Sequence, residues 1–290
     1  MDIVDSQVHL NRTGANWRDT DPEQTLAAGI LAMDAVGVDA AIMDERWGAH
    51  ILQDDRHMLR LANGVIRYSF PFSELGVSRH PKRLAYVGRV ERDDPDLSNL
   101  MADMRRRPGC VAMRIEPTPQ VEEIEPFRNG AYDAYFEAAR KCGMPVFVRM
   151  TREAELVEPY LRKFPDVQFI LDHCGTVNPP PPTWDERMAN IDKVAAMAKF
   201  PNLALKWCKA PSRISMQPYP YRDVMPVLRK LMDAFGPWRL MWAGDATQTT
   251  AQHSWAEALY YLIHADVIDA SEKEWLLGKA ARSILNWPAA

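Results

Sequence analysis

The stretch IVDSQVHL at residues 3–10 is an apolar, β-branched run that ends in polar side chains. Strands of a parallel sheet are buried on both faces, so they appear in a sequence as short continuous apolar runs. Seven further runs of this kind follow: VDAAIM at 38–43, LAYVGRV at 84–90, CVAMRI at 110–115, PVFVRM at 145–150, VQFILDH at 167–173, NLALKWC at 202–208 and RLMWAGD at 239–245. We expect each of the eight runs to form a strand.

Helical patterns with recognisable ends lie between these runs. Asp21 can cap a helix that has Pro22 at its first position and Gln24 three residues after the cap. Further helices are expected at 131–142, at 184–199, at 223–235, and in a last segment opened by a capping box from Ser271 to Glu274. Strands therefore alternate with helices throughout the chain.

Eight strands alternating with helices predict an α/β fold, a (β/α)8 TIM barrel formed as a single domain by residues 1–290. A doubly wound open sheet is the competing architecture. The first strand is not followed by a GxGxxG turn, and no Walker-type loop occurs, so the barrel is favoured. The longest connection, 44–83, is expected to form a lid or a rim.

Composition limits the classes of partner. The chain has 290 residues, 47% of them hydrophobic, and a net charge of −4, so we expect no nucleic-acid partner. The N-terminus lacks a signal-peptide pattern, and no window approaches 18 uninterrupted apolar residues, which predicts a cytoplasmic protein without a membrane partner. The four cysteines show no CxxC spacing, which argues against a zinc cluster or disulfide framework. A homo-oligomer remains open.

Polar residues end the predicted strands, where a barrel places its chemistry. Four of them are cations: Arg89, Arg114, Arg149 and Lys206. A single arginine at a strand end usually pairs with a carboxylate, but four such cations would need four separate buried partners. We therefore predict a positive pocket that binds a small anionic substrate through bidentate arginine contacts to carboxylates.

Two histidines and an aspartate form a second group. His9, His173 and Asp245 end the first, sixth and eighth predicted strands, and the first and last strands are neighbours in a closed barrel. These side chains are therefore expected to meet. The other histidines, at positions 50, 57, 80, 253 and 264, are expected at the surface, with His253 the exception to watch because it follows the eighth strand.

The sequence resembles the amidohydrolase superfamily, in particular the amidohydrolase-related (amidohydrolase 2) branch with lactonases for sugar acids and pyrone dicarboxylate. The resemblance spans nearly the whole chain and rests on four segments: DSQVHL at 5–10, ILDHCG at 170–175, LMWAGDA at 240–246 and GKAARSIL at 278–285. It implies a TIM barrel with one or two divalent metals, held by two histidines on strand 1, histidines on strands 5 and 6, and an aspartate on strand 8.

This chain departs from that metal-binding pattern at two positions. His9, His173 and Asp245 are retained, but Gln7 replaces the first histidine and Arg149 occupies the strand 5 position. An amide is a weak ligand for a transition metal. A guanidinium within about 5 Å of a divalent cation costs several kcal/mol at an effective dielectric near 20. We therefore predict no metal cofactor, with one divalent metal such as zinc at His9, His173 and Asp245 as the alternative.

These residues predict a metal-independent hydrolase that opens a carboxylate-bearing lactone of the sugar-acid, pyrone or muconate type. Asp245 is expected to be the general base, oriented by His173 or His9. Arg149, with Arg114 or Lys206, is expected to stabilise the oxyanion. Gln7, Arg89, Arg114 and Lys206 are predicted to bind the substrate. The alternatives are a lactone isomerase, a metal-dependent amidohydrolase or decarboxylase, and a non-catalytic dicarboxylate-binding protein.

Overall fold

Eight parallel strands form one sheet in the computed structural model, which describes residues 1–12, 21–45, 58–118, 122–150, 153–245 and 253–288. The strands are β1 (Val4–Val8), β2 (Ala40–Met43), β5 (Leu84–Gly88), β6 (Cys110–Ile115), β7 (Val146–Val148), β8 (Phe169–Leu171), β9 (Leu203–Cys208) and β10 (Leu240–Ala243). Each lies within one of the eight apolar runs, so all eight strand predictions are confirmed.

The strands lie side by side in chain order, from β1 to β10. The first and last strands also meet. Ser6 Oγ donates to the Trp242 carbonyl at 2.6 Å, and the Asp245 amide donates to the Gln7 carbonyl at 3.1 Å. These contacts close the sheet into a barrel, so the predicted (β/α)8 barrel is confirmed.

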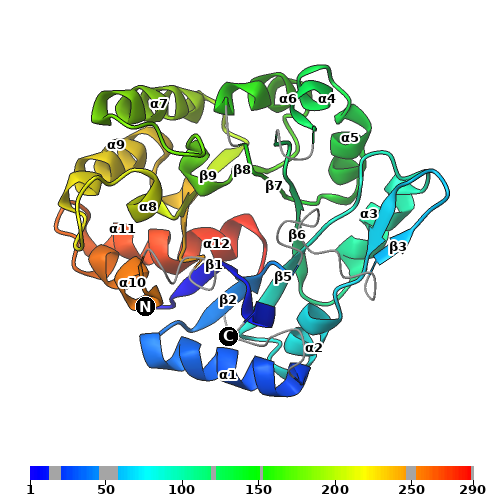
Figure 1. The fold of residues 1–290 in the computed structure, drawn as a ribbon, viewed down its shortest axis with the longest axis horizontal. Helices are drawn as coiled ribbons and strands as arrows, with labels where there is room; N and C mark the ends of the chain where they lie inside the picture. The colour runs from blue at the N-terminus through cyan, green and yellow to red at the C-terminus, as the bar shows by residue number, and fades with distance from the viewer. Residues whose placement is uncertain (13–20, 46–57, 119–121, 151–152, 246–252, 289–290) are drawn as a thin grey trace.

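Helices pack around the strands, most of them in a ring outside the barrel, as Figure 1 shows. They are α1 (Pro22–Val36), α2 (Pro71–Arg79), α3 (Leu97–Arg106), α4 (Ile124–Arg128), α5 (Asp133–Cys142), α6 (Glu158–Lys163), α7 (Trp184–Ala196), α8 (Ala210–Arg213), α9 (Met225–Phe235), α10 (Trp255–Ile263), α11 (Ala270–Glu274) and α12 (Ala280–Ile284). No helix among the described residues is both long enough and apolar enough to cross a membrane.

The ends of two predicted helices differ in detail from the expectation. Asp21 does cap α1, but its carboxylate accepts from the Glu23 amide at 2.8 Å. The last capping box is formed by Asp269 and Glu272, so the prediction of Ser271 as the cap is wrong. Asp269 and Ser271 each precede a glutamate by three positions, and the helix begins at the earlier of the two caps.

Side-chain alternation places the polar residues in the barrel mouth. The barrel interior contains Ile42, Val87, Ala112, Phe147, Ile170, Ala204 and Met241. Successive side chains of a strand point to opposite faces, so the residue two positions later shares the inner face. That step leads from Phe147 to Arg149 and from Ile170 to Asp172. In β1 the pairing register shifts between Asp5 and Val8.

The connection 44–83 contains a small antiparallel hairpin, β3 (Met58–Arg60) with β4 (Ile66–Tyr68), followed by α2. Residues 46–57 of this connection lie outside the described residues, so the predicted lid or rim is tested only in part. Ile66 and Tyr68 line a cavity of about 290 Å³ together with Arg89 and Glu116. The hairpin therefore forms part of a rim beside the barrel mouth.

The four cysteines are unpaired: Cys110, Cys174 and Cys208 are buried and Cys142 is half-buried. This agrees with the sequence-based argument against a disulfide framework.

Candidate active site

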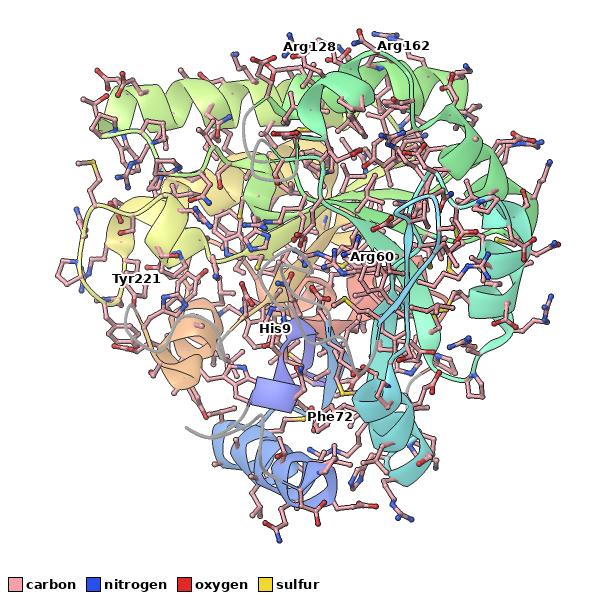
Figure 2. The ribbon with its side chains drawn as sticks, turned by 45° about the vertical axis from the view of Figure 1, so that its right-hand side comes forward. His9, Arg60, Phe72, Arg128, Arg162 and Tyr221 are labelled. Atoms are coloured by element: carbon pink, nitrogen blue, oxygen red, sulfur yellow. The ribbon has the colours of Figure 1, made fainter. Side chains whose placement is uncertain are left out.

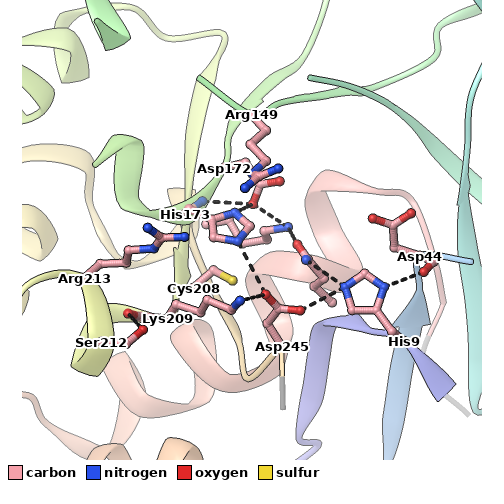
Figure 3. A network of polar contacts seen from close by, with 12 residues as sticks. His9, Asp44, Arg149, Asp172, His173, Cys208, Lys209, Ser212, Arg213 and Asp245 are labelled. Atoms are coloured by element: carbon pink, nitrogen blue, oxygen red, sulfur yellow. Dashed lines mark hydrogen bonds and ion pairs between the residues drawn. The ribbon is translucent and has the colours of Figure 1, made fainter. Parts of the chain in front are cut away.

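The Asp245 carboxylate lies at the centre of a polar cluster at the end of β10. Its Oδ1 lies 2.9 Å from His9 Nε2, and its Oδ2 lies 2.9 Å from Lys209 Nζ and 3.4 Å from His173 Nε2. Figure 3 shows these side chains reaching Asp245 from separate strand ends, and Figure 2 shows His9 inside the ring of helices. The predicted meeting of His9, His173 and Asp245 is therefore confirmed.

Three members of the cluster share an unusual backbone conformation. His173, Lys209 and Asp245 have φ angles of 51°, 54° and 47°, in the left-handed region that favours glycine. Each of them directly follows, or comes within two residues of, the end of a strand. Such conformations cost about 1–3 kcal/mol each and concentrate at functional sites. Here they turn three side chains toward one point.

His9 lies between hydrogen-bond donors and acceptors. Its Nδ1 lies 2.6 Å from the Asp44 carbonyl, which can only accept, so Nδ1 carries a proton. Lys206 donates to Gln7 Oε1, which fixes the Gln7 amide with its Nε2 toward His9 Nε2 at 3.3 Å. His9 Nε2 therefore faces both an N–H donor and the Asp245 carboxylate. A proton can move between His9 and Asp245 at this position.

His173 is held by the residue before it. Its Nδ1 lies 2.9 Å from Asp172 Oδ1, which orients the ring with Nε2 toward Asp245. Burial lowers the pKa of His173, and the nearby Arg149 guanidinium acts in the same direction, against the opposing effect of Asp172. The imidazole is therefore neutral at pH 7.

Asp245 is ionised despite its burial. Desolvation alone would raise the pKa of this carboxyl, but the Lys209 ammonium and the adjacent His173 and His9 side chains hold it well below its usual range. An ionised carboxylate can accept a proton from water.

All four predicted pocket cations contact buried carboxylates, and for three of them the contact is close. Arg114 contacts Asp172 at 2.6 Å, Glu116 at 2.8 Å, and Asp44. Arg89 contacts Asp44 at 3.1 Å and Glu116 at 3.2 Å, and Lys206 contacts Asp172 at 2.6 Å. The argument that these cations lack buried partners is wrong. Their role in substrate binding, like that of Gln7, stays a prediction.

The ion pairs perturb the carboxyl groups strongly. Burial opposes ionisation of Glu116, but Arg89 and Arg114 lower its pKa to about 2. Arg114 and Lys206 likewise hold the pKa of Asp172 well below its usual range, against desolvation. In this network the charges of three cations cancel those of three carboxylates: Arg89, Arg114 and Lys206 against Asp44, Glu116 and Asp172. It therefore contributes no net positive charge to the mouth of the barrel.

Two guanidinium groups at the mouth, those of Arg149 and Arg213, have no close carboxylate partner among the described residues. Arg149 has a long contact to Glu116 at 3.6 Å, and its Nε has no hydrogen-bond partner among the described residues. Arg213, from α8, contacts the Asn178 amide oxygen and points toward His173 in Figure 3. Burial lowers the pKa of Arg213, and so does the nearby Arg149. These guanidinium groups favour an anion between them.

Sequence reasoning missed Lys209 and Arg213. Both lie beyond the end of β9, and only the turn into α8 directs them into the mouth. His253, the exception among the histidines expected at the surface, is buried, and burial together with the nearby Lys209 lowers its pKa. His50 and His57 lie outside the described residues.

The donor atoms at the centre of the site do not fit a divalent cation as they are placed. The Lys209 ammonium already contacts Asp245, and Gln7 turns its N–H group, not its oxygen, toward His9. A divalent ion 4 Å from an ammonium is repelled by about 8 kcal/mol at an effective dielectric of 20.

A second group, Asp172, His173 and Cys208, has possible ligand atoms within 4.8 Å of one another. Asp172 is bound by Arg114 and Lys206, and burial keeps the pKa of the Cys208 thiol well above its usual value. Because those two cations engage its carboxylate, Asp172 is not placed to bind a divalent ion.

Comparison with known proteins agrees with this architecture. The model of the amidohydrolase family matches residues 4–287. An amidohydrolase from Burkholderia multivorans with bound zinc has a TM-score of 0.75 and 18% identity, over 99% of this chain and 100% of that one. A protein from Pseudomonas putida named as a candidate 2-pyrone-4,6-dicarboxylic acid hydrolase has a TM-score of 0.69 and 17% identity, over 100% and 99%.

A third similar structure is the 5-carboxyvanillate decarboxylase of Sphingomonas paucimobilis, with a TM-score of 0.63 and 16% identity, over 98% of this chain and 99% of that one. No match was found among curated proteins. At these identities the structural neighbours establish the fold alone.

Proposed function

Because the chain belongs to the amidohydrolase family, we propose that it is a hydrolase that opens a carboxylate-bearing lactone with water and without a metal. The observation that carries this proposal is the placement of the Asp245 carboxylate against His9, His173 and Lys209. A base, two imidazoles that can relay its proton, and a cation lie within one cluster. These are the groups that ester hydrolysis requires when no metal activates the water.

Asp245 acts as the general base in this mechanism. It removes a proton from water as the water oxygen attacks the lactone carbonyl carbon. His9 can share that proton, because its Nε2 already lies 2.9 Å from Asp245 Oδ1. The Asp172 carboxylate fixes the ring of His173. Because His173 Nε2 contacts Asp245 Oδ2, the fixed ring also limits the orientations of the Asp245 carboxylate.

The substrate class follows from the unbalanced cations. Arg149 and Arg213 lie at the mouth without an ion-pair partner closer than 3.6 Å among the described residues. A carboxylate on the substrate would provide the missing counter-ion, and a guanidinium binds it through two parallel hydrogen bonds. An aldaric, pyrone dicarboxylate or muconate lactone carries such a carboxylate in addition to its ester carbonyl. The candidate activity named for the Pseudomonas putida protein belongs to this class.

A panel of lactones tests the proposal. Aldonic, aldaric, pyrone and muconate lactones are incubated with the protein, with and without a chelator, and acid release is followed. We expect acid release from at least one carboxylate-bearing lactone at a rate that the chelator does not change. Loss of the substrate without acid release would instead indicate the isomerase. Activity that the chelator abolishes would indicate the metal-dependent alternative.

A non-catalytic binder is tested by the same panel. Such a protein would bind a dicarboxylate, as measured by calorimetry, and turn over none of the lactones. The buried Asp245 carboxylate argues against this alternative, since it would weaken the affinity for an anion placed beside it.

A further inference from the structure

The cation nearest to the base in this site is Lys209, a residue that follows β9. We propose that Lys209 is a catalytic residue, and that its ammonium binds the substrate carbonyl oxygen and stabilises the oxyanion formed by the attack of water. This role goes to Lys209 in place of Arg114 or Lys206. The inference rests on the proposed lactone hydrolysis.

The first argument is availability. Arg114 and Lys206 have side-chain exposures of 1% and 2%, and buried carboxylates hold both of them. The Lys209 side chain is 11% exposed, and among the described residues its ammonium has one ion pair, that with Asp245. An ammonium has three N–H donors. Donors therefore remain on Lys209 for a carbonyl oxygen, whereas Arg114 and Lys206 would have to break buried ion pairs first.

The second argument is position. Lys209 Nζ and His173 Nε2 both contact Asp245 Oδ2, at 2.9 Å and 3.4 Å. A carbonyl oxygen bound to the ammonium would bring its carbon next to the carboxylate that activates water. Asp245, the general base, and Lys209, which stabilises the developing negative charge, then lie on the same side of the substrate.

The third argument is the backbone. Lys209 takes a left-handed conformation with φ 54°, which lysine rarely adopts, and it does so at the junction of β9 and α8. Asp245, which Lys209 contacts, and His173, which contacts the same carboxylate, are in the same region. Two strained residues whose side chains both contact a third strained residue indicate a geometry maintained for function.

The proposed step balances as follows. The water oxygen bonds to the carbonyl carbon while one water proton passes to Asp245, and the π electron pair moves to the carbonyl oxygen beside Lys209. The carbonyl then re-forms, the ring carbon–oxygen bond breaks, and the proton passes from Asp245 to the leaving oxygen. The product is the open hydroxy acid, and no oxidant, reductant or further reactant is needed.

The test compares Lys209→Met, Lys209→Arg and Lys209→Ala with wild type, on a lactone that the panel identifies. Lys141→Met is the matched control, because Lys141 has a 61% exposed side chain on α5. Each variant is first checked for folding by circular dichroism and thermal melting.

We expect Lys209→Met to lose kcat by about 100- to 1000-fold, the effect typical of removing an oxyanion donor, with KM within about threefold of wild type. Lys209→Arg, which keeps the charge, should retain more activity than the methionine variant. Added ethylammonium should raise kcat of Lys209→Ala in proportion to its concentration. A residue with only a structural role would not produce that rescue.

A kcat of Lys209→Met within threefold of wild type would overturn the inference and leave the hydrolase proposal standing. If Lys209→Met does not fold, absence of amine rescue in a folded Lys209→Ala variant overturns it in the same way. A wild-type protein that hydrolyses no lactone of the panel would overturn the proposed function, and the role of Lys209 with it.

Discussion

His9 Nε2 lies 2.9 Å from Asp245 Oδ1, although the two residues are separated by almost the whole length of the chain. The contact exists because the first and last strands of the barrel meet, with the Asp245 amide donating to the Gln7 carbonyl. The closure of the barrel thus brings the proposed base and its proposed proton-sharing partner together.

Asp245→Asn is expected to lower kcat by at least about 100-fold, because an amide cannot accept the water proton. Removal of a negative charge from a positive mouth should leave the affinity for a carboxylate ligand unchanged or make it tighter. Acid release and calorimetry measure the two effects. Asp166→Asn, at an exposed position, is the control. Unchanged turnover would remove Asp245 from the mechanism.

Arg114→Met is expected to destabilise the protein by about 3–5 kcal/mol, since it leaves the buried Asp44 and Asp172 without their main counter-ion. Arg149→Met should cost about 1 kcal/mol or less, because the one described ion pair of Arg149 is a 3.6 Å contact to Glu116. Urea unfolding of both variants makes the comparison. Equal losses of stability in the two variants would contradict the assignment of Arg114 to the buried ion pairs and the proposed role of Arg149 in substrate binding.

The strands and the inner face of the barrel could be predicted from sequence because both follow from local regularities. Apolar runs mark the strands, and the two-residue period carries Phe147 to Arg149 and Ile170 to Asp172. Ion pairing could not be predicted in this way. Whether Arg114 faces substrate or Asp172 depends on the strand order and on distances across the barrel, which no local pattern specifies.

The residues that were missed lie where the chain leaves its regular structure. Lys209 reaches Asp245 through a left-handed turn after β9, a conformation that its sequence does not signal. The last capping box was misplaced because Asp269 and Ser271 both precede a glutamate by three positions, and the sequence pattern alone does not distinguish them.

Acid is expected to destabilise the protein through its buried carboxylates. The pKa of Glu116 is about 2 in the folded protein, against a usual value of 4.5, so the unfolded chain binds a proton at a higher pH. The contribution of Glu116 to the free energy of unfolding is therefore complete above about pH 4.5 and is lost as the pH falls toward about 2. It amounts to about 3 kcal/mol.

Urea unfolding at several pH values between 6 and 2.5 measures this effect. Glu116→Gln should show a shallower decline than wild type over that range. A free energy of unfolding that does not change between pH 5 and pH 3 would contradict the assignment of ionised, ion-paired carboxylates at Asp44, Glu116 and Asp172.

The final prediction concerns metal binding. Elemental analysis of the wild-type protein should give well under one metal per chain, because the fixed cations repel a divalent ion. The double variant Arg149→His/Lys209→Met removes two positive charges from the site and adds an imidazole. This variant should bind zinc at least about 100-fold more tightly than wild type in calorimetric titration, with His9, His173 and Asp245 as further ligands. Addition of Asp245→Asn to the same variant should abolish the gain. Stoichiometric zinc in the wild-type protein, removed by a chelator together with activity, would show that the site works with a metal after all.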